Sequence, residues 1–132
     1  SHVLPAMMRK FITAKSNNLN KVELWGTGNP RREFLHVDDL AEACFHILNQ
    51  KNEYSMINVG TGDDISIKEL AEMIKEVTGY KGELIWNTKK PDGTPRKLLE
   101  VSRIKNKGWK PKIDLLDGLN SVYKIISDSN WD

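Results

Sequence analysis

The segment from Ser66 to Gly79 constrains the fold of this chain most, because it carries a full set of signals for an amphipathic helix. It opens with S-I-K-E, in which Ser66 and Glu69 form a capping box for the free backbone N–H groups of a helix start. Gly79 provides the stop. Between them, apolar residues recur at helical spacing: Ile67, Leu70, Ala71, Ile74 and Val77. We expect this face to point into the core.

Helical and extended patterns alternate along the rest of the chain. One helix starts near Pro5 and ends at S-N-N-L-N, another begins at Asp38 and Asp39, and a last one is capped by Asp114. The second of these carries an apolar stripe of Leu40, Ala43, Cys44 and Ile47. Extended runs are predicted at 22–25, 32–37, 55–59, 83–86 and 98–101. The order predicts an α/β fold of mixed helices and short strands.

Length and composition indicate one soluble domain over residues 1–132. With 39% hydrophobic and 29% charged residues the chain is globular, and a net charge of +2 gives no bias toward nucleic acid or membrane. The one cysteine, Cys44, excludes a disulfide within the chain and fits a reducing, cytoplasmic setting. No apolar stretch approaches the length of a membrane span, and the amino terminus does not resemble a secretory signal.

The loop K-P-D-G-T-P-R-K, from Lys90 to Lys97, is the clearest candidate for binding an anion. Its prolines and glycine fix a tight path, so that three cations are held close together. Arg96 supplies a planar fork that matches phosphate, and Asp92 adds an acceptor for a base or a sugar hydroxyl. A nucleoside diphosphate fits this inventory, whereas an ordinary solvated loop is the alternative.

Two G-T-G turns, at 26–28 and 60–62, resemble part of a dinucleotide-binding fingerprint. The second turn lacks the third glycine, whose position holds Ile65, and no acidic residue closes a following strand at the expected distance. The chain also has no Tyr-x-x-x-Lys pair. The sequence therefore argues against a cofactor site in these turns and against a tyrosine-based hydride-transfer site.

The three histidines match no metal-ligand spacing, so no metal site is predicted. His46 is expected to be a partly buried structural residue, and His36 could anchor a strand-to-helix turn. His2 precedes the first helix, where an imidazole can act as a general acid or base near neutral pH. Its alternative origin is the remainder of a cleaved expression tag.

Other candidate ligand contacts surround the first G-T-G turn. Arg31 and Arg32 follow this turn and could aim a guanidinium at a phosphate. Trp25 precedes it and offers an aromatic face to a sugar or base, although core filling is the commoner role of a strand tryptophan. Arg9 and Lys10 could reach the same ligand or form a solvated helix face.

Several strings together resemble one enzyme family. H-V-L-P-A-M-M-R-K, L-W-G-T-G-N-P-R-R-E-F-L-H-V-D-D-L-A, I-N-V-G-T-G and K-P-D-G-T-P-R-K-L-L-E-V-S-R look like the GDP-L-fucose synthases, NADPH-dependent epimerase-reductases of the extended short-chain dehydrogenase/reductase group. The resemblance implies a carboxy-terminal, substrate-binding part of such an enzyme. The Rossmann half, which in the family holds NADPH and the Ser-Tyr-Lys set, is absent here.

The resemblance also assigns residues. His2 matches the family histidine that acts as epimerisation acid/base and lies near the cofactor, while Cys44 is not its partner cysteine. The positions that match contacts to the GDP-sugar are Lys10, Trp25, Arg32, Asp92 and Lys97. The family commonly has arginine at the position of Lys10. Arg32 and Lys97 are expected to hold the pyrophosphate, and the fragment alone is expected to be inactive.

The implied reaction converts GDP-4-keto-6-deoxymannose to GDP-L-fucose by C3/C5 epimerisation and C4 reduction, in a cytoplasmic enzyme that is commonly a homodimer. Two alternatives stay open: a fragment of another nucleotide-sugar epimerase or dehydratase, and a free-standing nucleotide-sugar binding module. A nucleic-acid module through Lys89, Lys90, Arg96 and Lys97 is the least supported. In the family the helix at Asp38 and the strand through Ile57 contact the Rossmann half, so exposed apolar surface is expected on this chain.

Overall fold

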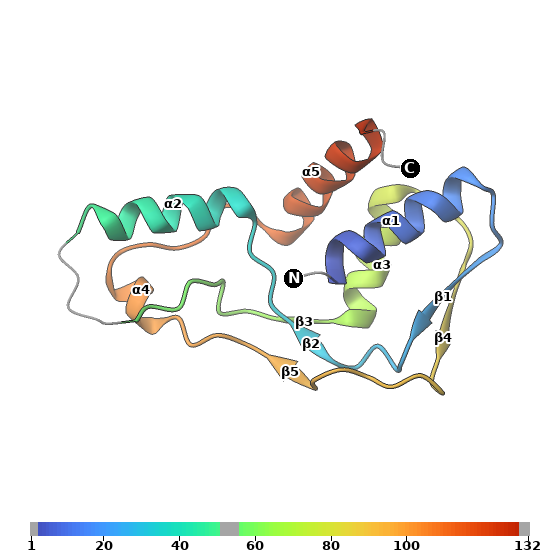
Figure 1. Ribbon diagram of the computed structural model, residues 1–132, viewed down its shortest axis with the longest axis horizontal. Helices are drawn as coiled ribbons and strands as arrows, with labels where there is room; N and C mark the ends of the chain where they lie inside the picture. The colour runs from blue at the N-terminus through green and yellow to red at the C-terminus, as the bar shows by residue number, and fades with distance from the viewer. Residues whose placement is uncertain (1–2, 51–55, 130–132) are drawn as a thin grey trace.

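The computed structural model describes residues 3–50 and 56–129 (Figure 1). Its helices are α1 (Val3–Ser16), α2 (Val37–Leu48), α3 (Ile67–Thr78), α4 (Ser102–Asn106) and α5 (Leu115–Asp128). Its strands are β1 (Lys21–Trp25), β2 (Arg31–Arg32), β3 (Ile65–Ser66), β4 (Glu83–Asn87) and β5 (Arg96–Lys97). The predicted α/β class is confirmed.

Helix α3 has the predicted boundaries. The Ser66 side chain accepts a hydrogen bond from the backbone N–H of Glu69, and Gly79 ends the helix in the left-handed conformation at φ 72°. The face that the sequence assigns to the core is buried at Leu70, Ala71 and Ile74. The capping signals therefore fix both ends of the helix that the main core is built on.

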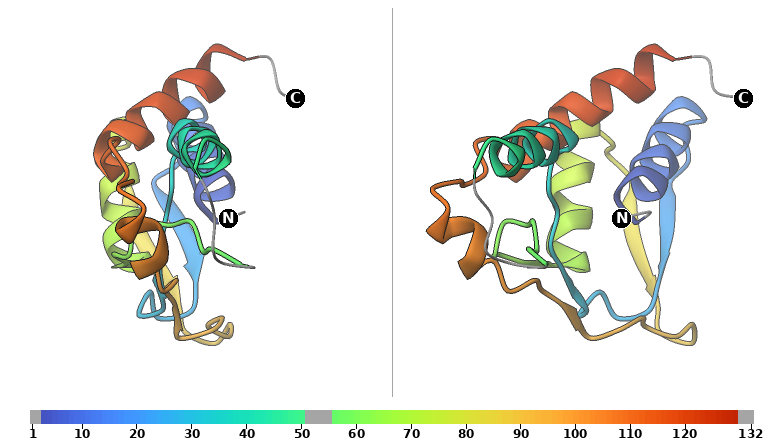
Figure 2. Two further views of the ribbon diagram at one scale, coloured as in Figure 1. Left: turned by 90° about the vertical axis from the view of Figure 1, so that its left-hand side faces the viewer. Right: turned by 60° about the vertical axis from the view of Figure 1, so that its left-hand side comes forward.

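The main hydrophobic core lies between helices α1, α3 and α5 and the parallel strands β1 and β4 (Figure 2). Strand β1 alternates exposed and buried residues, with Val22 and Leu24 pointing inward. On α1, Met8 and Phe11 are fully buried, and the Phe11 ring meets Tyr80 edge-on at a centroid distance of 5.8 Å. This core holds the carboxyl end of β1, where Trp25 and the first G-T-G turn follow.

A smaller core joins α2 to α4 at the other end of the molecule. It contains Ala43, Val101, Ile104 and Trp109. Asp39 on α2 is 2% exposed, and its carboxylate accepts hydrogen bonds from the backbone N–H groups of Lys112 and Ile113 at 3.1 and 2.9 Å. Asp39 thus contributes more than a favourable helix-dipole charge, because it fastens the chain before α5 to α2.

A three-stranded sheet of order β3-β2-β5 lies between the two cores, as Figure 1 shows. Strand β2 pairs antiparallel with β3 and parallel with β5. Each of these strands has only two residues, so few ladder hydrogen bonds hold the sheet. Side-chain contacts must supply the remaining cohesion.

The extended runs of the sequence analysis are partly wrong. The run 32–37 contributes only Arg32 to a strand, 56–59 of the run 55–59 forms no strand, and 98–101 forms none, while residue 55 lies outside the described residues. Strand β5 instead falls inside the predicted loop, and the short helix α4 was not predicted. Periodicity fails here because the strands are too short to show an alternation.

The apolar stripe predicted for α2 is also wrong in its orientation. Ala43 is buried and Ile47 half-buried, but Leu40 and Cys44 are exposed. Burial of the Asp39 carboxylate turns this helix so that a second apolar row faces outward: Val37, Leu40, Phe45 and Leu48.

Across the described ranges no helix has both the length and the apolar character that crossing a bilayer requires.

We expect the outward row of α2 to make this chain self-associate, because Phe45 and Leu48 are 69% and 82% exposed. Sedimentation velocity should show species larger than a monomer at micromolar concentrations. Phe45→Glu with Leu48→Glu should restore a monomer without lowering the melting temperature. Ile125→Glu on α5, at a side chain of similar 66% exposure, is the control and should leave the association unchanged. A wild-type chain that is monomeric and melts sharply would refute this expectation.

Candidate functional site

A cavity of about 260 Å³ opens between the end of β1 and the loop that follows β4. Its polar groups come from Arg32 and Asp92, and its aromatic walls are Trp25 and Trp86. The remaining lining is mainly apolar and includes Val3, Met7, Leu24, Pro30, Ile67 and Pro91. A mostly apolar cavity with a few convergent polar groups is typical of a site for a small organic ligand. Three predicted contacts, Trp25, Arg32 and Asp92, therefore share one cavity.

The loop from Lys90 to Lys97 is fastened over this cavity at two points. At one end, the carboxylate of Asp92 accepts hydrogen bonds from the Thr27 backbone N–H at 2.8 Å and from the Thr27 hydroxyl at 2.7 Å. At the other end, the Arg32 guanidinium donates to the carbonyl of Thr94 at 2.6 Å. The loop is thereby tied to the turn after β1 and to strand β2.

Trp25 presents an exposed ring at this cavity. Its side chain is on the outward-facing side of β1, the residue is 62% exposed, and the ammonium of Lys90 lies 5.1 Å from the centre of its ring. Trp25 therefore does not fill the core, the alternative that the sequence left open. A cation beside an aromatic face is suited to a planar base joined to a phosphate.

Arg32 and Lys97 are direct neighbours on the parallel strands β2 and β5. Arg31 pairs in the same way with Arg96, one position earlier. Since side chains alternate between the two faces of a sheet, Arg31 and Arg96 project to the opposite face from Arg32 and Lys97. Of the four cations, only Arg32 lines the cavity.

Asp64 holds the first of these faces together. Its carboxylate is 5% exposed and accepts hydrogen bonds from Arg31 Nε at 2.9 Å and from Arg96 Nε at 2.7 Å. The hydrogen bond from Arg31, with a further one from Arg96, keeps the pKa of Asp64 below its ordinary value despite opposing desolvation. This bridge fixes the register of β2 and β5, and so places Arg32 beside Lys97.

Both G-T-G turns already hold a carboxylate of the chain itself. Asp92 occupies the turn at 26–28, and Glu33 accepts a hydrogen bond from the Gly62 backbone N–H in the turn at 60–62. A Cβ atom placed on Gly60 would lie 2.6 Å from a Glu33 oxygen. A dinucleotide pyrophosphate would have to displace these carboxylates, so the turns do not fit NADPH. This agrees with the sequence argument against a cofactor site here.

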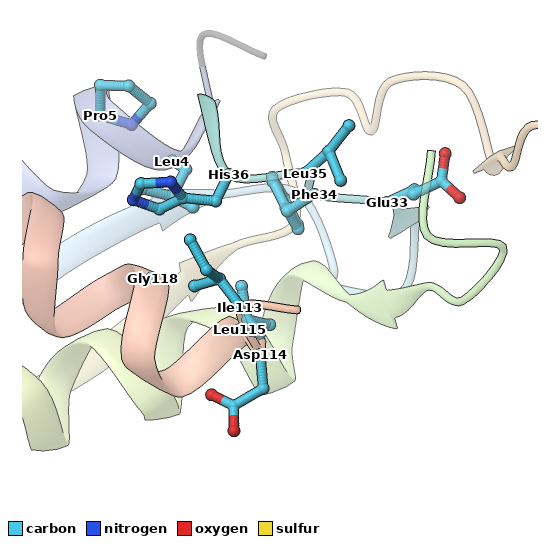
Figure 3. A pocket seen from close by; sticks show the side chains of 10 residues that line it. All are labelled: Leu4, Pro5, Glu33, Phe34, Leu35, His36, Ile113, Asp114, Leu115 and Gly118. Carbon is cyan, nitrogen blue, oxygen red and sulfur yellow. The ribbon is translucent and has the colours of Figure 1, made fainter. Parts of the chain in front are cut away.

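A second cavity, of about 190 Å³, lies between α1, the 33–36 segment and the start of α5 (Figure 3). The carboxylates of Glu33 and Asp114 point away from it, toward the backbone N–H groups that they bind. Its walls are largely apolar, and His36 contributes the ring whose Nδ1 accepts from the Asp38 N–H as the cap of α2. This cavity therefore offers little to a phosphate.

The remaining predicted residues have different locations. His2 lies outside the described residues, although the next residue, Val3, lines the Trp25 cavity. Lys10 lines a separate depression on α1 and is not brought to that cavity. His36 caps the start of α2, but residues 33–36 form no strand, so the predicted strand-to-helix turn is wrong on the strand side; the half-buried His46 contacts the Lys107 carbonyl. In the described part of the chain, no three His, Cys, Asp or Glu side chains form a group that could hold a metal ion.

Sequence reasoning missed Thr27, Glu33 and Trp86 as parts of this region. Trp86 stands next to Leu24 in the β1–β4 register, and its ring would contact a Cβ atom at Gly28 at 3.0 Å. The aromatic residue in a predicted strand was the available signal. No local signal identifies Glu33 or Thr27, because their partners lie 29 and 65 positions away.

Comparison with known proteins shows which enzymes this chain is similar to. Residues 1–60 match the family described as "NAD dependent epimerase/dehydratase family". The chain is 56% identical over 124 residues to putative GDP-L-fucose synthase 2 of Arabidopsis thaliana and 48% identical over 133 residues to GDP-L-fucose synthase of Escherichia coli K12, in each case over 94% of its own length. The chain is therefore similar to GDP-L-fucose synthases over nearly all of its own length, and its first 60 residues match the epimerase/dehydratase family.

A solved structure is also similar to nearly the whole of this chain. The GDP-mannoheptose C4 reductase from Campylobacter jejuni, determined with NADP bound, is similar with a TM-score of 0.81 and 40% identity over 95% of this chain. The chain spans 44% of that structure, and 38% and 41% of the lengths of the two synthases. The similarity thus covers nearly all of this chain but less than half of each relative.

The bridge at Asp64 predicts a pH dependence of stability. Because the pKa is lower in the folded chain, the contribution of this carboxylate is present above its ordinary value of 3.8 and is lost as the pH falls through the folded value. Urea unfolding of Asp64→Asn should therefore show a smaller loss of stability between pH 5 and pH 3 than the wild type. Asp63→Asn, at the exposed neighbouring carboxylate, should keep the wild-type slope. Equal slopes for all three proteins would contradict the bridge.

Proposed function

We propose that this chain is the GDP-sugar-binding portion of a GDP-L-fucose synthase, corresponding to the carboxy-terminal domain of that enzyme. One observation carries the proposal: the loop from Lys90 to Lys97 closes on the turn after Trp25 and forms a cavity with an aromatic wall and a guanidinium. The same loop is the string most characteristic of the family that the sequence resembles. The whole enzyme would convert GDP-4-keto-6-deoxymannose to GDP-L-fucose with NADPH.

In this proposal the cavity binds the nucleotide part of the substrate. Trp25 offers its exposed ring for stacking on the base or the sugar. Arg32 and Lys97, side by side on β2 and β5, supply charge for the pyrophosphate. Asp92 and Lys10 complete the proposed contacts, although Lys10 lies in the separate depression on α1 and would need a ligand that extends across the helix. These groups position the substrate and break no bond.

His2 is the proposed acid/base of the epimerisation. A ketone at C4 of the sugar acidifies the protons at C3 and C5, so that a nearby imidazole can remove or return one of them. Its chain neighbour Val3 lines the cavity. The second acid/base group would come from another part of the enzyme.

Neither G-T-G turn offers NADPH a free cradle, since both hold carboxylates of the chain. In the full enzyme, NADPH would reduce the C4 ketone and would be held mainly by an amino-terminal Rossmann half, with His2 near it. Accordingly we expect this chain alone to bind nucleotide but not to catalyse. A cytoplasmic homodimer is the expected form of the whole enzyme.

Calorimetric titration with GDP and GDP-fucose, with UDP and ADP as controls, tests the proposal. We expect GDP-selective binding, because the loop and Arg32 form the site without further segments. Preference for UDP would instead favour another nucleotide-sugar epimerase or dehydratase. Absence of binding to every nucleotide would contradict a preformed site on this chain.

The variant Arg32→Gln should weaken GDP binding at least tenfold, about 1.4 kcal/mol, because it removes both the charge in the cavity and the tie to the Thr94 carbonyl. The control is Lys124→Gln on α5, which removes the same charge at an exposed position away from both the cavity and the α1 depression, and should leave GDP affinity unchanged. Equal losses in the two variants would indicate unspecific charge attraction and would count against the proposed site.

A further inference from the structure

The hydroxyl of Thr27 both donates and accepts a hydrogen bond within the protein. It donates to Asp92 Oδ2 at 2.7 Å and accepts from the backbone N–H of Asn29 at 3.1 Å. The backbone N–H of the same residue donates to Asp92 Oδ1 at 2.8 Å. One threonine thus binds both oxygens of the carboxylate and also closes its own turn.

The glycine before Thr27 makes this close approach possible. Gly26 has φ +86°, and a Cβ atom placed on it would collide with the Asp92 carboxylate. A side chain here would both strain the backbone and push the loop away. A glycine at position 26, directly before Thr27, is therefore required for Asp92 to lie against the turn.

The loop residues on either side of Asp92 belong to the cavity wall. Pro91 and Gly93 both line it, and Lys90 lies beside the exposed ring of Trp25. Thr27 and Asp92 are 65 positions apart in the sequence, so only the fold brings the two segments together. The contact between the Thr27 and Asp92 side chains therefore determines the position of the cavity wall that Pro91 and Gly93 form.

We propose that Thr27 is a positioning residue for nucleotide binding, and that its contact with Asp92 is a latch that holds the Pro91–Gly93 wall in place. This inference rests on the proposed function for the identity of the ligand, a guanine nucleotide. It changes the role of Asp92: both carboxylate oxygens serve the Thr27 turn, so the group acts first on the loop and not as a reader of the base.

The latch can be tested without any ligand, by residue-resolved amide hydrogen exchange of the 132-residue chain. Thr27→Val keeps the shape of the side chain but removes its hydroxyl, which accepts from the Asn29 amide and donates to Asp92. Loss of these two hydrogen bonds should speed exchange of the Asn29 amide about tenfold. Asp92→Ala should speed exchange of the Thr27 amide by a similar factor. Thr27→Ser restores the hydroxyl and should behave like the wild type.

The Arg31 amide provides the internal control, because it donates to the Pro95 carbonyl at 2.8 Å and reports on the pairing of β2 with the loop end. It should stay protected in all three variants. Unchanged exchange at Thr27 and Asn29 would overturn the latch. Loss of protection at Arg31 as well would mean that the substitution loosens the whole sheet, which also overturns a local latch.

Affinity for GDP then tests positioning. Thr27→Val should weaken GDP binding about tenfold, Thr27→Ser should restore it, and the double variant with Asp92→Ala should lose no more than Asp92→Ala alone. If Asp92 read the base directly, Thr27→Val would leave affinity unchanged, and Asp92→Ala would abolish the preference for GDP over inosine diphosphate; that pattern overturns the inference. Failure of the wild-type chain to bind GDP would refute the proposed function, while the exchange data would still decide the latch.

Discussion

Carboxylates that bind backbone or side-chain donors far away in the sequence hold this chain together where regular secondary structure does not. Asp39 fastens the segment before α5 to α2, and Glu33 closes the turn at 60–62. Asp64 joins β2 to β5, and Asp92 joins the long loop to the turn after β1. Hydrogen bonds to a charged group are stronger than those between neutral groups, although competition by water weakens the exposed ones. Three strands of two residues could not provide comparable cohesion.

The candidate site follows from these contacts. The main core fixes β1 and β4, so that Trp25 and Trp86 have defined places at the end of a rigid pair of strands. The carboxylate bridges then bring the loop and β2 to that end. Of the proposed binding groups, Asp92 lies in the loop after β4, whereas Trp25, Arg32 and Lys97 lie on strands.

The same contacts make both glycine-rich turns a poor fit for the pyrophosphate of a dinucleotide. A glycine-rich turn attracts anions through its free backbone N–H groups, and here each of the two turns satisfies them with an internal carboxylate. Each G-T-G turn resembles part of a cofactor fingerprint, but here it joins two segments of the chain.

Local signals predicted the parts of the fold that local interactions determine. The capping box at Ser66, the stop at Gly79 and the cap at Asp114 gave correct helix ends, since each depends on residues three or four positions apart. The outward turn of α2 was not predictable, because it depends on Asp39 reaching residues 73 and 74 positions further on.

The residues of the candidate site were likewise predictable only where a local signal identified them. Aromatic and basic residue types identified Trp25 and Arg32, and both line the cavity, whereas Thr27 gave no signal because its partner is distant. The placement of Lys10 outside the cavity likewise depends on how α1 packs, which its own sequence does not reveal.

Nuclear magnetic resonance of the tryptophan indole N–H groups during addition of GDP tests the central claim most directly. Trp25 and Trp86 line the cavity, whereas Trp109 is buried in the separate core between α2 and α4. The account predicts saturable shifts of the first two signals with a common dissociation constant and no change for Trp109. The fourth tryptophan, Trp131, lies outside the described residues and is not used in the test. Shifts confined to Trp109, or equal shifts of the Trp25, Trp86 and Trp109 signals, would contradict a nucleotide site formed by the loop and the turn after β1.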